Sequence, residues 1–302
     1  MNIAALYTCH NRKEKTKESL KNLFKSLDYY NERNIIPMSI SIYLTDDGST
    51  DGTREEIYRQ FNNRNITIIN GDGNLFWSRG MNKAWKASLC SKTIYDGFLL
   101  LNDDTFIFEG CLQEIINTHK WCIEKYKKEG IYSGVTCSPN NKEETTYSGK
   151  KYTNKLLGHA NRLAPIGVPQ LADEVNANIL YIPKSVVNIL GTFYNGFHHG
   201  SADFDYSMRA NKKGIPVLIT AKYCGCCERD HQNIKENTEM LKNMSLKQRI
   251  EYFKNPRHSY HDYLLYLRRN IPLKYPFSLF TMIIREYLPN LFYLVLKRRN
   301  II

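Results

Sequence analysis

The chain has 302 residues, of which 42% are hydrophobic and 24% charged, values that suit a folded protein and exclude a disordered or collagen-like chain. The formal net charge is +12, and residues 241–302 alone contain 12 Lys and Arg against 3 Asp and Glu. A basic end beside a nearly neutral body favours an anionic partner, either phospholipid or nucleic acid, or is simply a solvated exterior.

The N-terminus has no signal-peptide pattern. Met1–Lys15 is charged at the place where a secretory signal would need an apolar stretch. We therefore expect a cytoplasmic protein.

Strands alternate with helices over the first 125 residues. Short apolar or β-branched runs predict strands, whereas apolar residues three or four positions apart predict helices. The predicted strands are Asn2–Cys9, Ser39–Thr45, Asn65–Ile69 and Gly97–Leu101, and the predicted helices are Lys13–Tyr30, Thr53–Phe61 and Trp77–Leu89. This alternation is typical of an α/β fold with a mainly parallel sheet between helices.

Polar clusters directly follow three of these strands, at Thr8–Asn11, Asp46–Ser49 and Asn102–Thr105. Ligands of open α/β sheets bind beyond the carboxyl ends of the strands, so the three clusters should line one crevice. Carboxylates in such a place suit a divalent cation, because Mg²⁺ and Mn²⁺ prefer oxygen ligands.

The pattern from about residue 126 to residue 234 is less regular. The predicted strands there are Ile131–Cys137, Ala177–Ile182 and Val217–Thr220, and the predicted helices are Pro183–Leu190 and Phe204–Lys213. Beyond residue 235 the pattern changes to basic, aromatic helices.

An apolar stripe at helical spacing runs through Phe277–Leu296. The segment is about as long as a membrane span, but Arg285, Glu286 and Pro289 within it disfavour spanning. Two interpretations remain open. The segment lies in a membrane interface, flanked by the basic run 297–299, or it packs on the rest of the protein.

Three segments occur in an informative order: Thr8–Arg12 (TCHNR), Thr45–Thr53 (TDDGSTDGT) and Leu101–Asp104 (LNDD). They resemble the successive nucleotide-binding motifs of family 2 glycosyltransferases, and the similarity extends over roughly the first 230 residues. Asn74–Trp77 (NLFW) is similar to the rhamnosyltransferase-like subgroup. The resemblance implies a GT-A fold, a nucleotide-binding mixed sheet flanked by helices, here with a C-terminal helical extension. It also implies a nucleotide-sugar donor and inversion at the anomeric carbon.

The resemblance also implies roles for particular residues. The donor-binding residues would be Thr8, Arg12, Asp47, Asn74, Arg79 and Asp103, and the ligands of a Mn²⁺ or Mg²⁺ ion would be Asp104 and His231. Arg79 would pair with phosphate or sit on a solvated helix, and His231 has the alternative of a surface histidine. Asn102 occupies a position where many relatives carry Asp, which leaves fewer carboxylates for a metal.

Inverting transfer needs a general base that takes the proton from the acceptor hydroxyl. Gly200–Arg209 resembles the acidic motif that precedes a helix in the family, and within it Asp203 matches the base. Asp205 is the alternative base or a helix-start residue. Ala202 replaces a frequent Glu.

The expected protein is thus a hexosyltransferase-type enzyme of surface polysaccharide biosynthesis. Residues 1–234 would form the catalytic domain, with 1–125 binding a UDP- or dTDP-linked sugar and 126–234 binding a saccharide or lipid-linked saccharide acceptor. Residues 235–302 would be the extension, and in the membrane interpretation it would attach the protein to the inner face of the cell membrane.

Two other function classes compete with this expectation. The charge of +12 suits a nucleic-acid-binding protein, but no recognised nucleic-acid motif occurs, so we expect no nucleic-acid partner. A sugar-1-phosphate nucleotidyltransferase would normally have a glycine- and arginine-rich phosphate loop where this chain has Thr8–Arg12.

Overall fold

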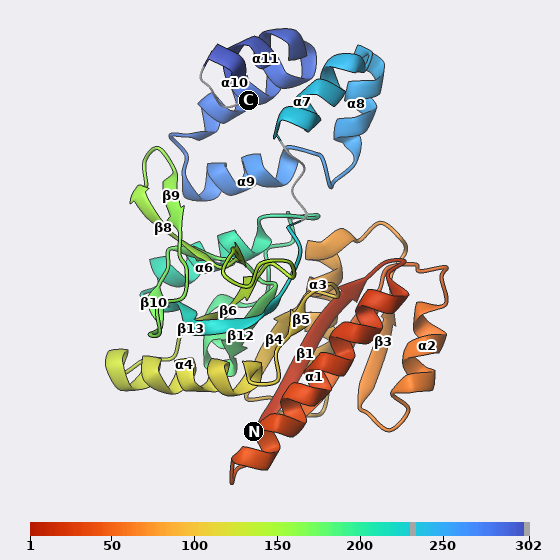
Figure 1. Cartoon of the computed structure of the whole chain (residues 1–302), viewed down its shortest axis with the longest axis vertical. Coiled ribbons are helices and arrows are strands. Elements are labelled where there is room, and N and C mark those ends of the chain that lie inside the picture. The colour runs from red at the N-terminus through yellow and green to blue at the C-terminus, as the bar shows by residue number, and fades with distance from the viewer. Residues whose placement is uncertain (230–233, 299–302) are drawn as a thin grey trace.

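The structure, a computed structural model, describes residues 1–229 and 234–298. Its centre is one mixed sheet (Figure 1), with strands in the spatial order β10 (Gln170–Leu171), β13 (Val217–Cys226), β6 (Ile131–Cys137), β12 (Ile179–Pro183), β4 (Gly97–Leu101), β1 (Asn2–Cys9), β2 (Ser39–Asp46) and β3 (Ile66–Asn70). Strands β1 to β4 are mutually parallel, and β12 joins them antiparallel to β4. Two short strands extend the sheet, β5 (Phe106–Ile107) on β13 and β7 (Thr145–Tyr147) on β6.

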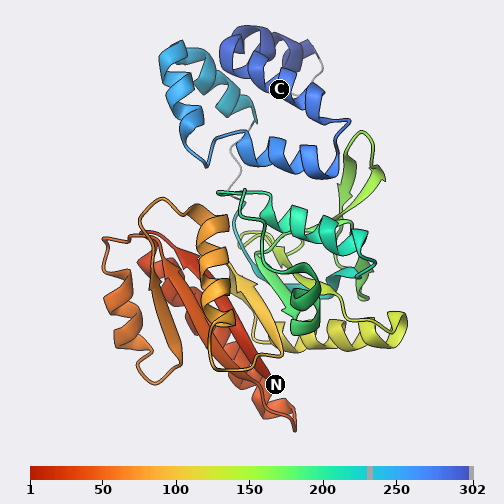
Figure 2. The same ribbon diagram turned by 180° about the vertical axis from the view of Figure 1, so that it is seen from behind.

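Helices cover both faces of this sheet, as Figures 1 and 2 show from opposite sides. One face packs against α1 (Lys13–Arg33), α2 (Thr53–Gln60) and α4 (Cys111–Tyr126), and the other against α3 (Phe76–Leu89), α5 (Lys184–Leu190) and α6 (Ala202–Lys212). Side chains of a strand point alternately to opposite faces. Accordingly, Ile3 and Ala5 of β1 belong to the hydrophobic core on the side of α1, α2 and α4. Ala4 and Leu6 belong to the core on the side of α3, α5 and α6. The predicted α/β fold is confirmed.

A smaller sheet of β11 (Glu174–Val175), β8 (Gly149–Asn154) and β9 (His159–Arg162) lies beside the main one. Its β8–β9 hairpin points toward the C-terminal helices (Figure 1). The hydroxyls of Tyr152 and Tyr266 are 2.9 Å apart, and the Lys274 ammonium donates to the carbonyl of Gly158. The hairpin therefore contacts α9 and the segment between α9 and α10.

Five helices make up the C-terminal part: α7 (Ile234–Asn243), α8 (Leu246–Lys254), α9 (His261–Asn270), α10 (Tyr275–Tyr287) and α11 (Pro289–Arg298). They lie together at the end of the molecule opposite the N-terminus (Figure 1). Helix α9 buries Tyr266 and Leu267 in the core that contains α6, whereas α10 contains no buried residue. Helix α9 therefore packs on the rest of the protein, whereas the apolar side chains of α10 remain exposed.

The apolar segment Phe277–Leu296 does not form one continuous helix, contrary to the stripe read from the sequence. It breaks at Leu288 into α10 and α11, which are bent by 119°. Pro289 explains the break, because proline has no N–H to donate and disfavours helical backbone in the residue before it. Among the described residues no single helix has the length and hydropathy to cross a bilayer, and only the bent pair together meets those two criteria.

Helix α9 is attached to α6 through the fully buried carboxylate of Asp205. This carboxylate accepts hydrogen bonds from Arg269 at 2.8 Å and from the Asn270 amide at 2.9 Å, and it pairs with Arg209 at 3.2 Å. A buried charge is stable only when its partners are in place, so this cluster fixes how the C-terminal helices join the body.

We expect Asp205→Ala to lower the free energy of unfolding by about 3–5 kcal/mol, because it leaves Arg209 and Arg269 without their counter-charge. Urea unfolding monitored by circular dichroism measures the change. Glu251→Ala is the control, since Glu251 forms a solvent-exposed pair with Lys254 and should leave the midpoint almost unchanged. Equal midpoints for the two variants would contradict this account of Asp205.

Candidate active site

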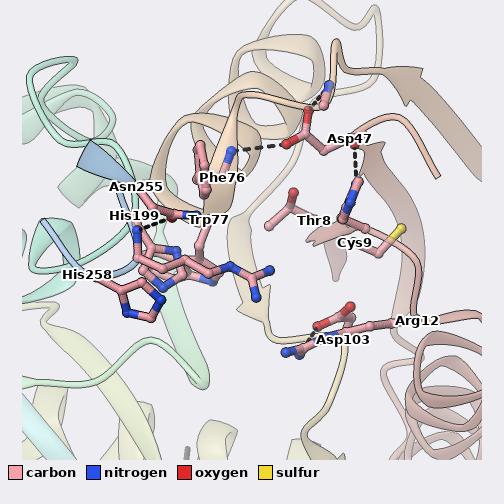
Figure 3. Close-up of a pocket in the computed structure, with 13 residues that line it drawn as sticks. Thr8, Cys9, Arg12, Asp47, Phe76, Trp77, Asp103, His199, Asn255 and His258 are labelled. Atoms are coloured by element: carbon pink, nitrogen blue, oxygen red, sulfur yellow. Dashed lines mark hydrogen bonds and ion pairs between the residues drawn. The ribbon is translucent and has the colours of Figure 1, made fainter. Parts of the chain in front are cut away.

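The polar clusters predicted to share a crevice do lie at one edge of the sheet. Residues Thr8 and Cys9 stand opposite Thr45 and Asp46 in the parallel pair of β1 and β2, and β4 ends on the other side of β1. A cavity of about 440 Å³ opens there (Figure 3). Its lining includes the predicted donor residues Thr8, Arg12, Asp47 and Asp103.

Asp47 holds the loop that closes one side of this cavity. One carboxylate oxygen accepts the N–H of Gly73 at 2.9 Å, and the other accepts those of Leu75 at 2.9 Å and Phe76 at 3.0 Å (Figure 3). Phe76 takes a left-handed backbone conformation, φ 56°, which costs a non-glycine residue about 1–2 kcal/mol. The oxygen that accepts the Gly73 N–H is Oδ1. Because a carboxylate oxygen has two lone pairs, Oδ1 keeps one acceptor position for a ligand.

Thr8 lies at the contact between β1 and α3. A Cβ atom at Gly80 would overlap its hydroxyl oxygen, so only glycine allows α3 to approach the end of β1 this closely. Thr8 is buried but still lines the cavity. It therefore packs against α3 and also contributes to the cavity wall at the end of β1.

Arg12 connects the first and third clusters. Its Nη1 donates to Asp104 Oδ2 at 2.6 Å and to Asp103 Oδ1 at 3.3 Å. Burial and the neighbouring Asp104 charge raise the pKa of Asp103 to about 7, against the opposing effect of Arg12. Within the described residues, the buried Oδ2 atom of Asp103 has no hydrogen-bond partner.

These oxygens fit a hard divalent cation. Asp103 offers an unpartnered buried carboxylate oxygen, and Asp104 offers a second carboxylate in a cavity. Asn102 does not add a free ligand, because its side-chain oxygen accepts the indole N–H of Trp77 at 2.7 Å. The other predicted metal ligand, His231, lies outside the described residues.

Asp203 faces the same carboxylates across a second cavity of about 470 Å³, which Asp103, Asp104 and Asp203 all line. It stands in the first turn of α6, whereas the sequence pattern placed it ahead of the helix. Its oxygens accept the N–H of Ala177 at 3.0 Å and of Phe204 at 2.9 Å. Burial raises the pKa of Asp203 to about 6 despite these two bonds. Asp205, the alternative base, is buried in its ion-pair cluster and does not line this cavity.

Two predicted donor residues, Asn74 and Arg79, lie elsewhere. Both line a wide hollow between the start of α3 and the segment that joins α8 to α9, and neither lines the cavity that contains Asp47. Phe76, Asn255 and His258 line both spaces. The donor roles of Asn74 and Arg79 remain predictions.

The sequence analysis missed residues of the α8–α9 segment. Asn255, Arg257 and His258 line the 440 Å³ cavity. Figure 3 shows Asn255 and His258 across this cavity from the sheet edge. The nearby carboxylate of Asp262 accepts the backbone N–H groups of residues 198–200, just before the motif of Asp203. The sequence did contain a signal, because Asn255-Pro256 is a turn-forming pair that interrupts the aromatic helices.

Solved structures share this fold. The mannosyltransferase PcManGT from Pyrobaculum calidifontis, solved with GDP-Man and Mn²⁺, has a TM-score of 0.51 and 14% identity, over 98% of this chain and 79% of that one. TarS from S. aureus has a TM-score of 0.51 and 13% identity, over 89% and 43%. GalNAc-T7, solved with UDP, GalNAc and Mn²⁺, has 0.54 and 12%, over 74% and 42%. The chain thus spans less than half the length of TarS and GalNAc-T7.

No curated protein gave a match to this chain. Residues 6–133 match the family described as Glycosyl transferase family 2. That region contains the second half of β1, the whole of β2 to β4 and most of the 440 Å³ cavity lining, including Asp47 and Asp103. This region is therefore similar to glycosyltransferase family 2, and the chain has the GT-A fold of the glycosyltransferases named above.

Proposed function

We propose that this protein is an inverting hexosyltransferase that moves a sugar from a nucleotide-diphosphate donor to an acceptor hydroxyl. The observation that carries the proposal is that Asp103, Asp104 and Asp203 line one cavity, although α6 follows β4 by about a hundred residues. Carboxylates that differ in surroundings and face one space suit separate tasks at a reacting centre.

Asp203 would be the general base. Each of its oxygens accepts one backbone N–H, and each therefore keeps a lone pair for the acceptor hydroxyl. Its pKa of about 6 leaves the carboxylate unprotonated near neutral pH and basic enough to take a proton. The acceptor oxygen attacks the anomeric carbon as its proton passes to Asp203, and the nucleoside diphosphate leaves from the opposite face, which inverts the configuration.

Asp104 and Asp103 would hold a Mn²⁺ or Mg²⁺ ion, which supplies positive charge against the leaving diphosphate. Arg12, paired with both carboxylates, keeps them oriented toward the cavity. Phe76 and Trp77 line the donor cavity from the Asn74–Trp77 segment, where aromatic faces suit a base or a sugar ring.

The donor would be a UDP- or dTDP-linked sugar. Nucleotides or nucleotide-sugars are present together with Mn²⁺ in the structures of PcManGT and GalNAc-T7, and these two proteins share the fold. The Asn74–Trp77 sequence supports a rhamnosyltransferase-like subgroup, and with it a role in surface polysaccharide biosynthesis on a saccharide or lipid-linked saccharide acceptor.

The acceptor would be reached at the inner face of the cell membrane, where α10 and α11 would attach the protein as a peripheral component. Phe277 is 74% exposed and Phe280 65% exposed, and α11 adds exposed apolar side chains such as Leu291 and Leu294. The exposed cations Lys297 and Arg298 end this surface. An exposed apolar face with flanking basic residues is typical of helices that lie in the interface of an anionic membrane.

The first test incubates the purified protein with a panel of UDP- and dTDP-sugars and saccharide acceptors, with Mn²⁺ or with a chelator. We expect transfer from at least one donor, and loss of about 10²–10⁴-fold in kcat for Asp203→Asn, because the base is removed. Asp28→Asn, an exposed acid on α1, is the matched control and should retain activity. An Asp203→Asn variant with wild-type kcat would rule out the assignment of the base.

The second test is the pH dependence of kcat at saturating donor. Asp203 acts only when unprotonated, and its pKa is raised to about 6, so kcat should fall about tenfold per pH unit below pH 6 and level off above it. The charged neighbours that tune this value are Glu174, which raises the pKa, and Lys150, which lowers it. If kcat began to fall only near pH 4, about the ordinary pKa of a carboxylate, the result would contradict the raised pKa of Asp203.

The third test measures binding to sedimented vesicles of phosphatidylglycerol and phosphatidylcholine. We expect the wild type to bind the anionic vesicles, and Phe277→Ser with Phe280→Ser to weaken binding at least about tenfold, because two phenylalanines no longer enter the interface. Ile35→Ser with Ile36→Ser removes exposed apolar residues at a distant loop and should leave binding unchanged. Unaltered binding of the phenylalanine variant would exclude α10 as the contact.

A further inference from the structure

Building on the proposed function, we propose that Arg257, from the segment between α8 and α9, binds the diphosphate of the donor. The C-terminal helices would then complete the donor site as well as support it. The inference depends on where this segment lies, on the charges that surround it and on what holds it.

Arg257 stands where two cavities meet. It lines the 440 Å³ cavity with Thr8, Asp47 and Asp103, and it also lines the 470 Å³ cavity that contains Asp104 and Asp203. Its neighbours Asn255 and His258 face the sheet edge across the first cavity (Figure 3). A donor whose nucleoside occupies the first cavity and whose sugar occupies the second must place its diphosphate between them.

A cation beside the diphosphate would offset the acids at this junction, and the second cavity is lined by Lys150 and Arg162 in addition to Arg12 and Arg257. Asp47 and Asp103 line the first cavity, and Arg12, the other arginine there, is already paired with Asp103 and Asp104. Within residues 1–229 and 234–298, no ion pair engages Arg257. A guanidinium binds phosphate oxygens through two parallel N–H bonds, so Arg257 has both the free charge and the geometry for this ligand.

The segment is held firmly relative to the base. Asp262, at the start of α9, accepts the N–H of His199 at 2.7 Å and of Gly200 at 2.9 Å, directly ahead of Asp203. Burial alone would raise the pKa of Asp262, but the hydrogen bonds from His261 and from the 198–200 backbone lower it, so the carboxylate stays charged. The N–H of Arg257 itself donates to the Asn255 side chain at 3.0 Å, which orders the turn. The backbone of Arg257 is therefore held in an ordered turn, from which its exposed side chain lines both cavities.

Isothermal titration of the full chain with UDP, dTDP, UMP and dTMP, in the presence of Mn²⁺, tests the inference. For whichever diphosphate the wild type binds, we expect Arg257→Gln to weaken affinity about 10–100-fold, and to weaken affinity for the corresponding monophosphate by much less. Arg257→Lys should recover part of the loss, since it restores the charge without the paired N–H groups. Arg268→Gln removes the same charge from an exposed position of α9 outside both cavities, and it should bind as the wild type does.

The outcomes separate this inference from the proposed function. Wild-type affinity in Arg257→Gln, or an equal loss in Arg268→Gln, would overturn the role of Arg257 while leaving the enzyme assignment intact. A wild type that binds neither nucleoside diphosphate would contradict the proposed function and the inference together.

Discussion

Buried carboxylates that accept backbone N–H groups set the shape of three loops around the two cavities. Asp47 accepts the N–H groups of Gly73, Leu75 and Phe76, Asp203 accepts those of Ala177 and Phe204, and Asp262 accepts those of residues 198–200. Bonds from N–H groups to an ionised acceptor are about twice as strong as neutral ones, and a buried carboxylate without such partners is very costly. Each loop can therefore take only the shape that satisfies its acid. Asp47 and Asp203, which the sequence motifs assign to ligand binding and catalysis, therefore also hold the cavity walls in place.

The same constraint joins the C-terminal helices to the site. Two buried acids lie at this joint, Asp205 on α6 and Asp262 on α9. Each has one partner on its own helix, Arg209 and His261 respectively, and takes its other partners from the opposite side of the joint. Because both contacts flank the segment 198–205, the position of Asp203 depends on α9 being docked. The Asn255–His258 segment lies just ahead of α9, so the same docking contacts help to place it beside the cavities. The apolar face of α10 is excluded from this joint, which leaves it available for another surface.

The sequence predicted the parts that depend on local pattern and failed where distant segments decide. The alternation of strands and helices was visible because β1 to β4 are apolar runs that end in polar clusters, and parallel pairing then brings those clusters together. The pairing of Asp103 and Asp104 with Arg12 was not visible, since it joins residues about ninety positions apart. The α8–α9 contribution was missed because a basic, aromatic tail is read as an appendage when its docking contacts, such as Asp205 with Arg269, cannot be inferred from periodicity. The break at Leu288 could have been predicted from Pro289. It was missed because the apolar stripe continues on both sides of the proline and indicated one helix.

Asn102 illustrates how charge limits what this edge can hold. Its amide oxygen accepts the Trp77 indole, and an aspartate there would place a third carboxylate beside Asp103 and Asp104. The pKa of Asp103 is already raised to about 7 by burial and by one neighbouring charge. A further negative charge there would raise the pKa of Asp103 again. With asparagine, the side chain at this position is uncharged and is committed to the Trp77 indole, so the repulsion at this edge is limited to that between Asp103 and Asp104, which Arg12 offsets. In the proposed site Asn102 therefore supports Trp77, and the carboxylates of Asp103 and Asp104 are left to hold the cation.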